Sequence, residues 1–73
     1  MYKHKIELTT GDDIKEFVNI ATEETGVVRL IDGSGFCVNG KSLLGAMATV
    51  EWNSLYCESE DDIYHKIQRF CVV

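Results

Sequence analysis

The alternation of strand-like and helix-like patterns along the chain constrains its fold most. Residues 2–9 alternate between two faces, with Tyr2, His4, Ile6 and Leu8 on one of them, which predicts a half-buried strand. The period then changes, because the apolar residues of the segment 14–21 recur at i, i+3, i+4 and i+7. That spacing predicts an amphipathic helix. Its apolar residues are Ile14, Phe17, Val18 and Ala21.

Both ends of this first helix carry recognisable signals. Thr10 and Asp13 have the spacing of a capping box at its start. The acidic pair Asp12 and Asp13 suits the positive end of the helix dipole. Gly26 is placed to end the helix in a left-handed conformation.

The middle of the chain predicts a hairpin followed by a short helix and a further strand. The β-branched segment 27–31 and the segment 36–38 flank a turn cluster at residues 32–35. Residues 42–49 are mostly apolar and predict a short helix despite an internal glycine. Residues 54–58 predict the next strand.

The last element is a helix that begins with a second capping pattern. Ser59 and Asp62 repeat the spacing of Thr10 and Asp13. Ile63, Ile67 and Phe70 follow at helical spacing. The resulting order β-α-β-β-α-β-α predicts one α+β domain over residues 1–73, an open-faced sandwich with an antiparallel sheet covered by helices on one face.

Composition excludes several classes of function. The chain has 73 residues and a formal net charge of -5, so we expect neither nucleic acid nor an anionic membrane as a partner. No apolar run reaches transmembrane length, and we expect a cytoplasmic protein. Three cysteines without a C-x-x-C spacing predict free thiols. Cys37 and Cys57 fall inside predicted strands and are expected in the core, whereas Cys71 is expected near the surface.

Residues 35–42 read GFCVNGKS, which matches the phosphate-binding loop of nucleotide hydrolases. Such a loop needs flexible residues between its glycines, yet Phe36, Cys37 and Val38 are strand formers. The parallel βαβ context is also missing. Two readings of Ser42 remain: a helix N-cap, which is common, or an acceptor of phosphate at the helix start.

The segment 38–47 (VNGKSLLGAM) resembles the regulatory-serine segment of the HPr family, the histidine-containing phosphocarriers of the bacterial sugar phosphotransferase system. That family's pattern is N-[AG]-K-S-[ILM]-[ML]-G-[VL]-[ML]. Residues 57–62 (CESEDD) are similar to the acidic turn that opens the family's last helix. The resemblance implies the family's fold, a four-stranded antiparallel sheet with three helices on one face.

The chain departs from the family where phosphocarriers hold their histidine. They carry a G-[LI]-H-x-R-P-A stretch before the first helix, whereas residues 9–15 read TTGDDIK. The chain's histidines, His4 and His65, lie in other elements. The resemblance therefore implies a divergent, non-catalytic member that acts as a regulatory or interaction protein, switched by phosphorylation at Ser42. An HPr serine kinase or a transcription regulator is the kind of protein partner implied.

Two alternatives to that role stay open. The chain could be a phosphocarrier with an unconventional acceptor, or an orphan copy of the fold that binds an unknown partner. The resemblance places partner contacts at Lys41, Leu43 and Met47, and we expect Leu43 and Met47 to be exposed.

The remaining expectations concern packing, cofactors and assembly. Leu44 is expected to lie in the core, and Trp52 to be a partly buried anchor. We expect no catalytic residue, cofactor or metal, because neither a Cys-His pair nor a calcium-loop pattern is apparent. A monomer or weak dimer is expected.

Overall fold

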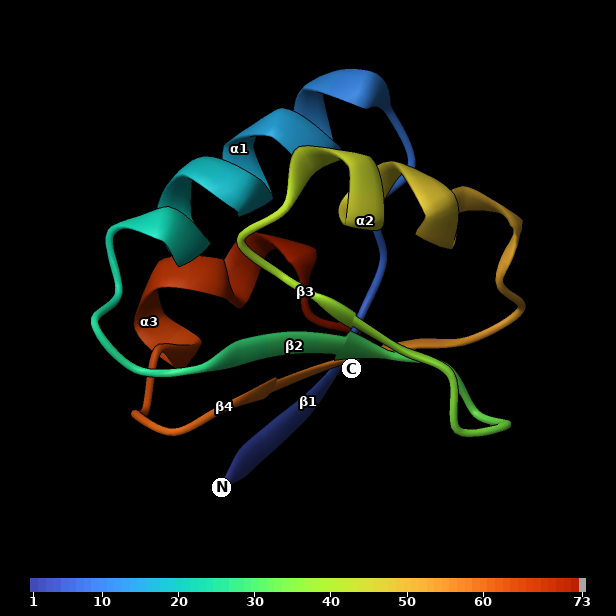
Figure 1. Cartoon of the computed structure of the whole chain (residues 1–73). Helices are drawn as coiled ribbons and strands as arrows, with labels where there is room; N and C mark the ends of the chain where they lie inside the picture. Colours follow the sequence, from blue (N-terminus) through green and yellow to red (C-terminus); the bar gives the residue numbers. More distant parts are fainter. Residues whose placement is uncertain (73) are drawn as a thin grey trace.

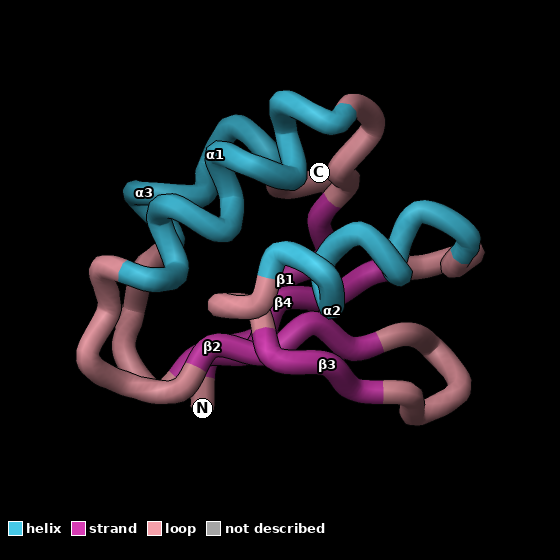
Figure 2. The backbone as a smooth tube through the Cα atoms, turned by 45° about the horizontal axis from the view of Figure 1, so that its top comes forward, coloured by secondary structure: helices cyan, strands magenta, loops and turns pink. Residues whose placement is uncertain are grey.

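Four antiparallel strands form one sheet, and the helices of residues 1–72, which the structure describes, all lie on one side of it (Figures 1 and 2). This arrangement, seen in a computed structural model, confirms the predicted order of elements and the α+β open-faced sandwich. The elements are β1 (Tyr2–Ile6), α1 (Gly11–Thr22), β2 (Val28–Ile31), β3 (Cys37–Asn39), α2 (Leu43–Ala48), η1 (Thr49–Glu51), β4 (Leu55–Ser59), α3 (Tyr64–Ile67) and η2 (Gln68–Phe70), where η marks a 3-10 helix.

The strand order in the sheet is β1-β4-β2-β3, so the last strand along the chain lies between the first and the second. Cys57 of β4 is paired with His4 on one side and with Leu30 on the other. These positions face the helices, and Leu30 and Cys57 are buried. Because side chains alternate along a strand, the intervening residues point away from the helices.

The core lies between the sheet and the inner face of α1. The four apolar positions predicted for this helix are all buried, which confirms the helical pattern. Phe17 is completely buried and meets Phe70 edge to face, with 6.1 Å between the ring centroids. Burial of each such side chain contributes about 1.5–3 kcal/mol to folding.

The C-terminal end of α1 differs from the prediction. The helix stops at Thr22, and its C-cap Glu23 has right-handed backbone angles. Within residues 1–72, a positive φ occurs only at Gly35, in the turn before β3. Gly26 is therefore not a left-handed cap. A Cβ atom there would lie 3.0 Å from Asp61 Oδ2 and 3.1 Å from Glu60 Cβ, so the position requires a small residue for close packing.

The predicted cap of the last helix is also wrong. Ser59 is buried at the end of β4, and its hydroxyl donates a hydrogen bond to the carbonyl oxygen of Asp61 at 2.7 Å. The helix begins only at Tyr64, whose N–H donates to Asp62 Oδ1 at 3.1 Å. The strand thus continues one residue further than expected, and Ser59 stabilises the turn that follows it.

The three cysteines are free thiols, as predicted, but one of them lies elsewhere than expected. Cys57 is buried, whereas Cys37 is exposed. Cys37 is paired with Ile31, while its neighbour Val38 is paired with the buried Leu30. The sequence predicted that Cys37 lies in a strand, but not which face of the sheet it occupies. A shift of one residue exchanges the two faces.

Candidate functional site

The Gly-Lys-Ser segment is a tight connection between β3 and α2. The Gly40 N–H donates to the Val28 carbonyl at 2.8 Å, and the Ser42 N–H donates to the Asn39 carbonyl at 3.1 Å. The Lys41 N–H donates to Asn39 Oδ1 at 2.9 Å. All three backbone donors are used inside the protein, so they cannot encircle a phosphate as a nucleotide-binding loop requires.

Ser42 is the N-cap of α2, as predicted. Its hydroxyl accepts a hydrogen bond from the Gly45 N–H at 3.2 Å, and its carbonyl accepts one from Ala46 at 2.9 Å. The residue is partly exposed. Such a cap typically contributes about 1 kcal/mol to stability. Ser42 therefore has a structural task at the start of the helix.

The outward face of α2 and η1 is apolar. Leu43 and Met47 are 42% and 51% exposed, which confirms that both are substantially exposed. Leu44 is 81% exposed, so its predicted place in the core is wrong. Val50, which is 62% exposed, continues this surface onto η1. We call these four residues the α2 apolar face.

The inner side of α2 explains why Leu44 points outward. Small residues occupy the inner positions, and Ala46 and Thr49 are buried there. A Cβ atom at Gly45 would lie 3.4 Å from the Asn39 carbonyl oxygen and from Val38 Cβ, so this side of the helix is in direct contact with β3. The signal for this arrangement was the run of small residues at positions 42, 45, 46 and 49.

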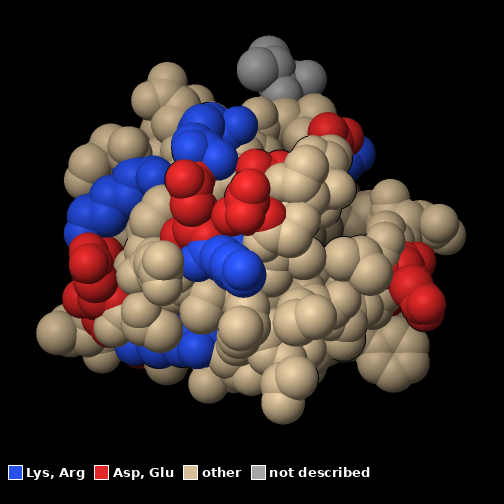
Figure 3. Space-filling view, turned by 90° about the horizontal axis from the view of Figure 1, so that it is seen from above, with Lys and Arg blue, Asp and Glu red and all other residues tan. Residues whose placement is uncertain are grey.

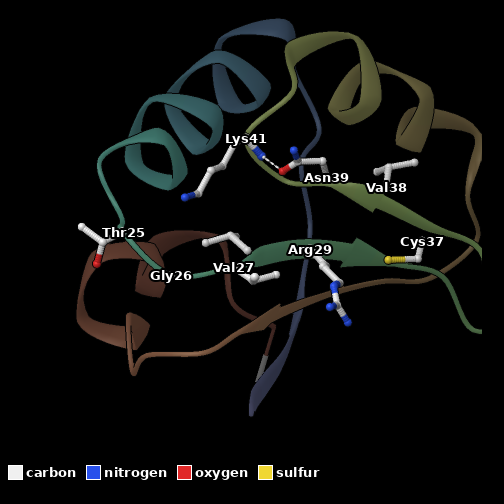
Figure 4. A pocket seen from close by; sticks show the side chains of 9 residues that line it. Thr25, Gly26, Val27, Arg29, Cys37, Val38, Asn39 and Lys41 are labelled. Carbon is white, nitrogen blue, oxygen red and sulfur yellow. Dashed lines mark hydrogen bonds between the residues drawn. The ribbon is translucent and has the colours of Figure 1, made fainter.

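Lys41 is held by a contact within the protein. Its ammonium group donates to the carbonyl oxygen of Glu24 at 2.6 Å, beyond the end of α1. The same lysine borders a hollow of about 360 Å³ beside the edge strand β3 (Figure 4). In this view its amine points toward the segment that carries Thr25 and Gly26, whereas Arg29 points to the other side of the sheet.

The start of α1, near which the resemblance places the family's histidine, carries a hydrogen-bonded carboxylate. Asp13 Oδ2 accepts hydrogen bonds from the Thr9 N–H at 3.1 Å and the Thr9 hydroxyl at 2.9 Å. The predicted cap is confirmed, because Thr10 Oγ1 accepts from the Asp13 N–H at 3.1 Å. The Thr9 hydroxyl and N–H hold the pKa of Asp13 below its usual value.

The cation beside Asp13 is Arg69, from the end of the chain. Arg69 forms ion pairs with Asp13, at 3.3 Å, and with Glu16. The nearest cation is thus already paired with carboxylates, and an incoming phosphoryl group would meet negative charge. Neither histidine lies at this point: His4 belongs to β1, where its ring contacts Tyr64 in a tilted arrangement, and His65 belongs to α3.

Metal-binding clusters and membrane-spanning helices are absent from the described part of the chain. Residues 1–72 contain no group of three or more His, Cys, Asp and Glu side chains that could hold a metal ion. None of the helices in this range has the length and apolar character needed to cross a membrane. Trp52 is partly buried and packs against the core, as predicted.

Comparison with known proteins supports the fold. No protein-family model and no curated protein match the sequence. Among solved structures, the chain is similar to the crystal structure of HPr-C-His from Thermoanaerobacter tengcongensis. The sequence identity is 22% and the TM-score is 0.71, over 93% of this chain and 84% of that chain. The chain therefore has an HPr-like fold, as the sequence resemblance implied.

Proposed function

We propose that this chain is a non-catalytic, HPr-like regulatory protein that binds a protein partner through the α2 apolar face. The observation that carries the proposal is the position of Ser42, which caps a helix whose Leu43, Leu44 and Met47 are all exposed. Several large apolar side chains that are exposed side by side are typical of a protein-interaction site. Figure 3 shows an uncharged area beside the charged side chains of the helix layer.

Ser42 gives this surface a means of control. A kinase would transfer the γ-phosphoryl group of ATP to the Ser42 hydroxyl oxygen, which loses its proton as ADP leaves. The phosphoserine would add a charge of about -1.5 to -2 next to Leu43 and Met47. Desolvating that charge is costly, so a partner that covers the apolar side chains would bind less tightly, unless it supplies a cation.

Lys41 can contact a partner only after its present hydrogen bond is broken. Its ammonium now donates to the Glu24 carbonyl, and it would have to leave that oxygen before it could contact a partner or a phosphate on Ser42. Its role as a partner-binding residue thus requires a local rearrangement. Leu43 and Met47 require none, since both are already exposed.

The start of α1 supports a role other than histidine phosphotransfer. The segment from Thr9 to Asp13 contains no histidine, and Asp13 accepts three hydrogen bonds there, two from Thr9 and one from Arg69. A phosphorylated enzyme I, formed with phosphoenolpyruvate, is therefore expected to leave the protein unmodified. Acid-labile phosphate on His4 or His65 would contradict this and favour the phosphocarrier alternative.

The experiment that tests the regulatory proposal measures the intact mass after incubation with ATP and an HPr serine kinase. We expect one phosphate on the unmodified chain and none on Ser42→Ala. Ser34→Ala is the matched control, because Ser34 is an exposed serine in the β2–β3 turn, and it should still be phosphorylated. Phosphate that persists in Ser42→Ala, or none on the unmodified chain, would overturn the assignment.

Docking can be tested in the same reaction. Leu43→Ser and Met47→Ser remove apolar side chains that are about half exposed, so each should lower the free energy of unfolding by only about 1 kcal/mol and leave the protein folded. If the kinase covers the α2 apolar face, both variants should be phosphorylated more slowly although Ser42 is intact. Rates equal to that of the unmodified chain would show that this face does not bind the kinase.

A further inference from the structure

The side of the sheet away from the helices is uncovered in the described chain (Figure 1). Its side chains alternate with the buried ones along each strand, so they are identified by strand position and register. We call this surface the open sheet face. Its strand residues are Lys3, Lys5, Arg29, Ile31, Cys37, Asn39, Tyr56 and Glu58.

Positive charge is concentrated on the open sheet face of an acidic protein. Three of the seven Lys and Arg residues occupy strand positions of this face, but only one of the twelve Asp and Glu residues does, since Glu7 lies just beyond β1. Three cations and one carboxylate give these strand positions a formal charge of +2, whereas the whole chain carries -5. The sequence alone places Lys3 and Lys5 on the same face of their strand. Only the strand order of the sheet shows that Arg29 lies on that face as well.

The cations form two rows across the sheet. Lys3 and Arg29 flank Glu58, and the Arg29 guanidinium lies 3.5 Å from Glu58 Oε1. Lys5 and Ile31 flank Tyr56 in the next row. The guanidinium-bearing side chain of Arg29 is 45% exposed although it is paired, while Glu58 is only 23% exposed. Lys5 makes no ion pair with another side chain of residues 1–72. This surface therefore keeps a net positive charge although Glu58 lies between Lys3 and Arg29, and Tyr56 and Ile31 form a less polar row beside them.

We propose that the open sheet face binds an acidic protein segment in an extended conformation, with acidic residues at alternate positions. Alternate residues of an extended chain are about 7 Å apart, which is also the separation of Lys3 and Lys5 along β1. Arg29 lies two strands away, at about 10 Å. Tyr56 and Ile31, which follow Lys5 in its row across the sheet, can pack against the apolar part of the bound segment.

Other occupants fit this surface less well. A symmetric pair of copies joined through their open faces would bring like charges together. Single-stranded nucleic acid is bound by several stacking aromatic rings, but Tyr56 is the aromatic residue among the strand positions of this face, and the Lys3 ammonium lies 5.0 Å from its ring centroid. The negative charge of the whole chain would also repel a long polyanion.

The test is an NMR titration of the labelled protein with a peptide of alternating Glu and Thr residues. The shifted backbone amides should map to β1, β2 and β4, and affinity should fall as salt is added. Lys5→Glu should weaken binding about fivefold, the equivalent of losing one exposed ion pair. Lys15→Glu is the matched control, since it makes the same change of charge on the exposed side of α1, and it should bind like the unmodified chain.

Several outcomes would overturn the proposal: no shifts, shifts confined to the helix layer, or equal weakening by Lys5→Glu and Lys15→Glu. Tighter binding of an oligothymidylate to the same amides would identify a nucleic-acid surface instead. Concentration-dependent sedimentation that Lys5→Glu abolishes would identify a second copy. Because the α2 apolar face lies on the helix side, Leu43→Ser should leave peptide binding unchanged, so this result is independent of the function proposed for α2.

Discussion

The ammonium group of Lys41 donates a hydrogen bond to the carbonyl oxygen of Glu24 at a distance of 2.6 Å. This contact joins the start of α2 to the chain that leaves α1, where carbonyl groups lack helical partners. Lys41→Met keeps the apolar stem but loses the bond, and should lower the free energy of unfolding by about 1–2 kcal/mol. Urea denaturation measures this. Lys15→Met should have an effect below about 0.5 kcal/mol, and equal effects would show that the contact contributes nothing.

Close packing against Val28 explains why the residue before Lys41 and Ser42 is a glycine, Gly40. An added Cβ would lie 2.9 Å from Val28 Cγ1 and 3.0 Å from the Val28 carbonyl oxygen. Gly40→Ala should therefore destabilise the fold by about 1–3 kcal/mol, because β2 would have to move. Gly11→Ala is the control, since a Cβ there meets nothing within 4 Å. Thermal unfolding of both variants measures the difference, and an unchanged Gly40→Ala would show that the close approach can relax.

The order of elements could be predicted from the sequence because local patterns dominate it. The apolar stripe of α1, its Thr10 cap and the Ser42 cap of α2 depend on residues a few positions apart. Turn residues likewise located the β2–β3 hairpin, where the positive φ of Gly35 lies. Two local predictions failed, the left-handed cap at Gly26 and the helix cap at Ser59. The other failures concerned relations between elements.

Two residues show what the sequence could not provide. Whether Leu44 is buried depends on which side of α2 packs against β3, and that side carries Gly45 and Ala46. Whether Arg29 lies near Lys3 depends on β4 being inserted between β1 and β2. For the same reason the α2 apolar face was predicted in part, whereas the cation-rich open sheet face was missed.

The pKa of Asp13 offers a test of the carboxylate that fills the start of α1. The Thr9 hydroxyl and N–H hold this pKa below the ordinary 3.8. The fold thus favours the ionised form, so this contribution to stability is present above about pH 3.8 and is lost as the pH falls through the lower folded value. Thr9→Val should raise the pKa of Asp13 toward 3.8 and reduce the acid dependence of stability in that window.

Carboxyl-carbon NMR titration measures this shift directly. Asp32 is the internal control, because it lies far from Thr9 in sequence, in the β2–β3 turn. Partial burial raises the pKa of Asp32, but the hydrogen bonds from Phe36 and Ser34 lower it by more, so this pKa also lies below 3.8. Thr9→Val should leave the pKa of Asp32 unchanged. If the pKa of Asp13 also stays the same, the Thr9 hydroxyl is not what holds the carboxylate in place.

His4 contributes a polar atom to the interior without a partner for it. Its Nε2 is buried and has no hydrogen bond among the described residues, while its ring lies tilted by 45° against Tyr64, with 5.1 Å between the ring centroids. His4→Phe keeps an aromatic ring and removes the unpaired nitrogen, so it should raise the free energy of unfolding by about 1 kcal/mol. His65→Phe on the exposed side of α3 should change it by less than about 0.5 kcal/mol. A destabilised His4→Phe would show that Nε2 is hydrogen-bonded in solution.

The three thiols should differ in reactivity in a fixed order. Burial raises the pKa of Cys57 to about 12, and it also raises the pKa of the partly buried Cys71. Cys37 is exposed. Because the thiolate is the reactive form, an aromatic disulfide reagent should modify Cys37 first and Cys71 more slowly. Cys57 should react only as fast as the fold opens. Stopped-flow absorbance measures the phases, and Cys37→Ser should remove the fast one. A fast phase that persists in Cys37→Ser would contradict the register that places Cys37 on the open sheet face.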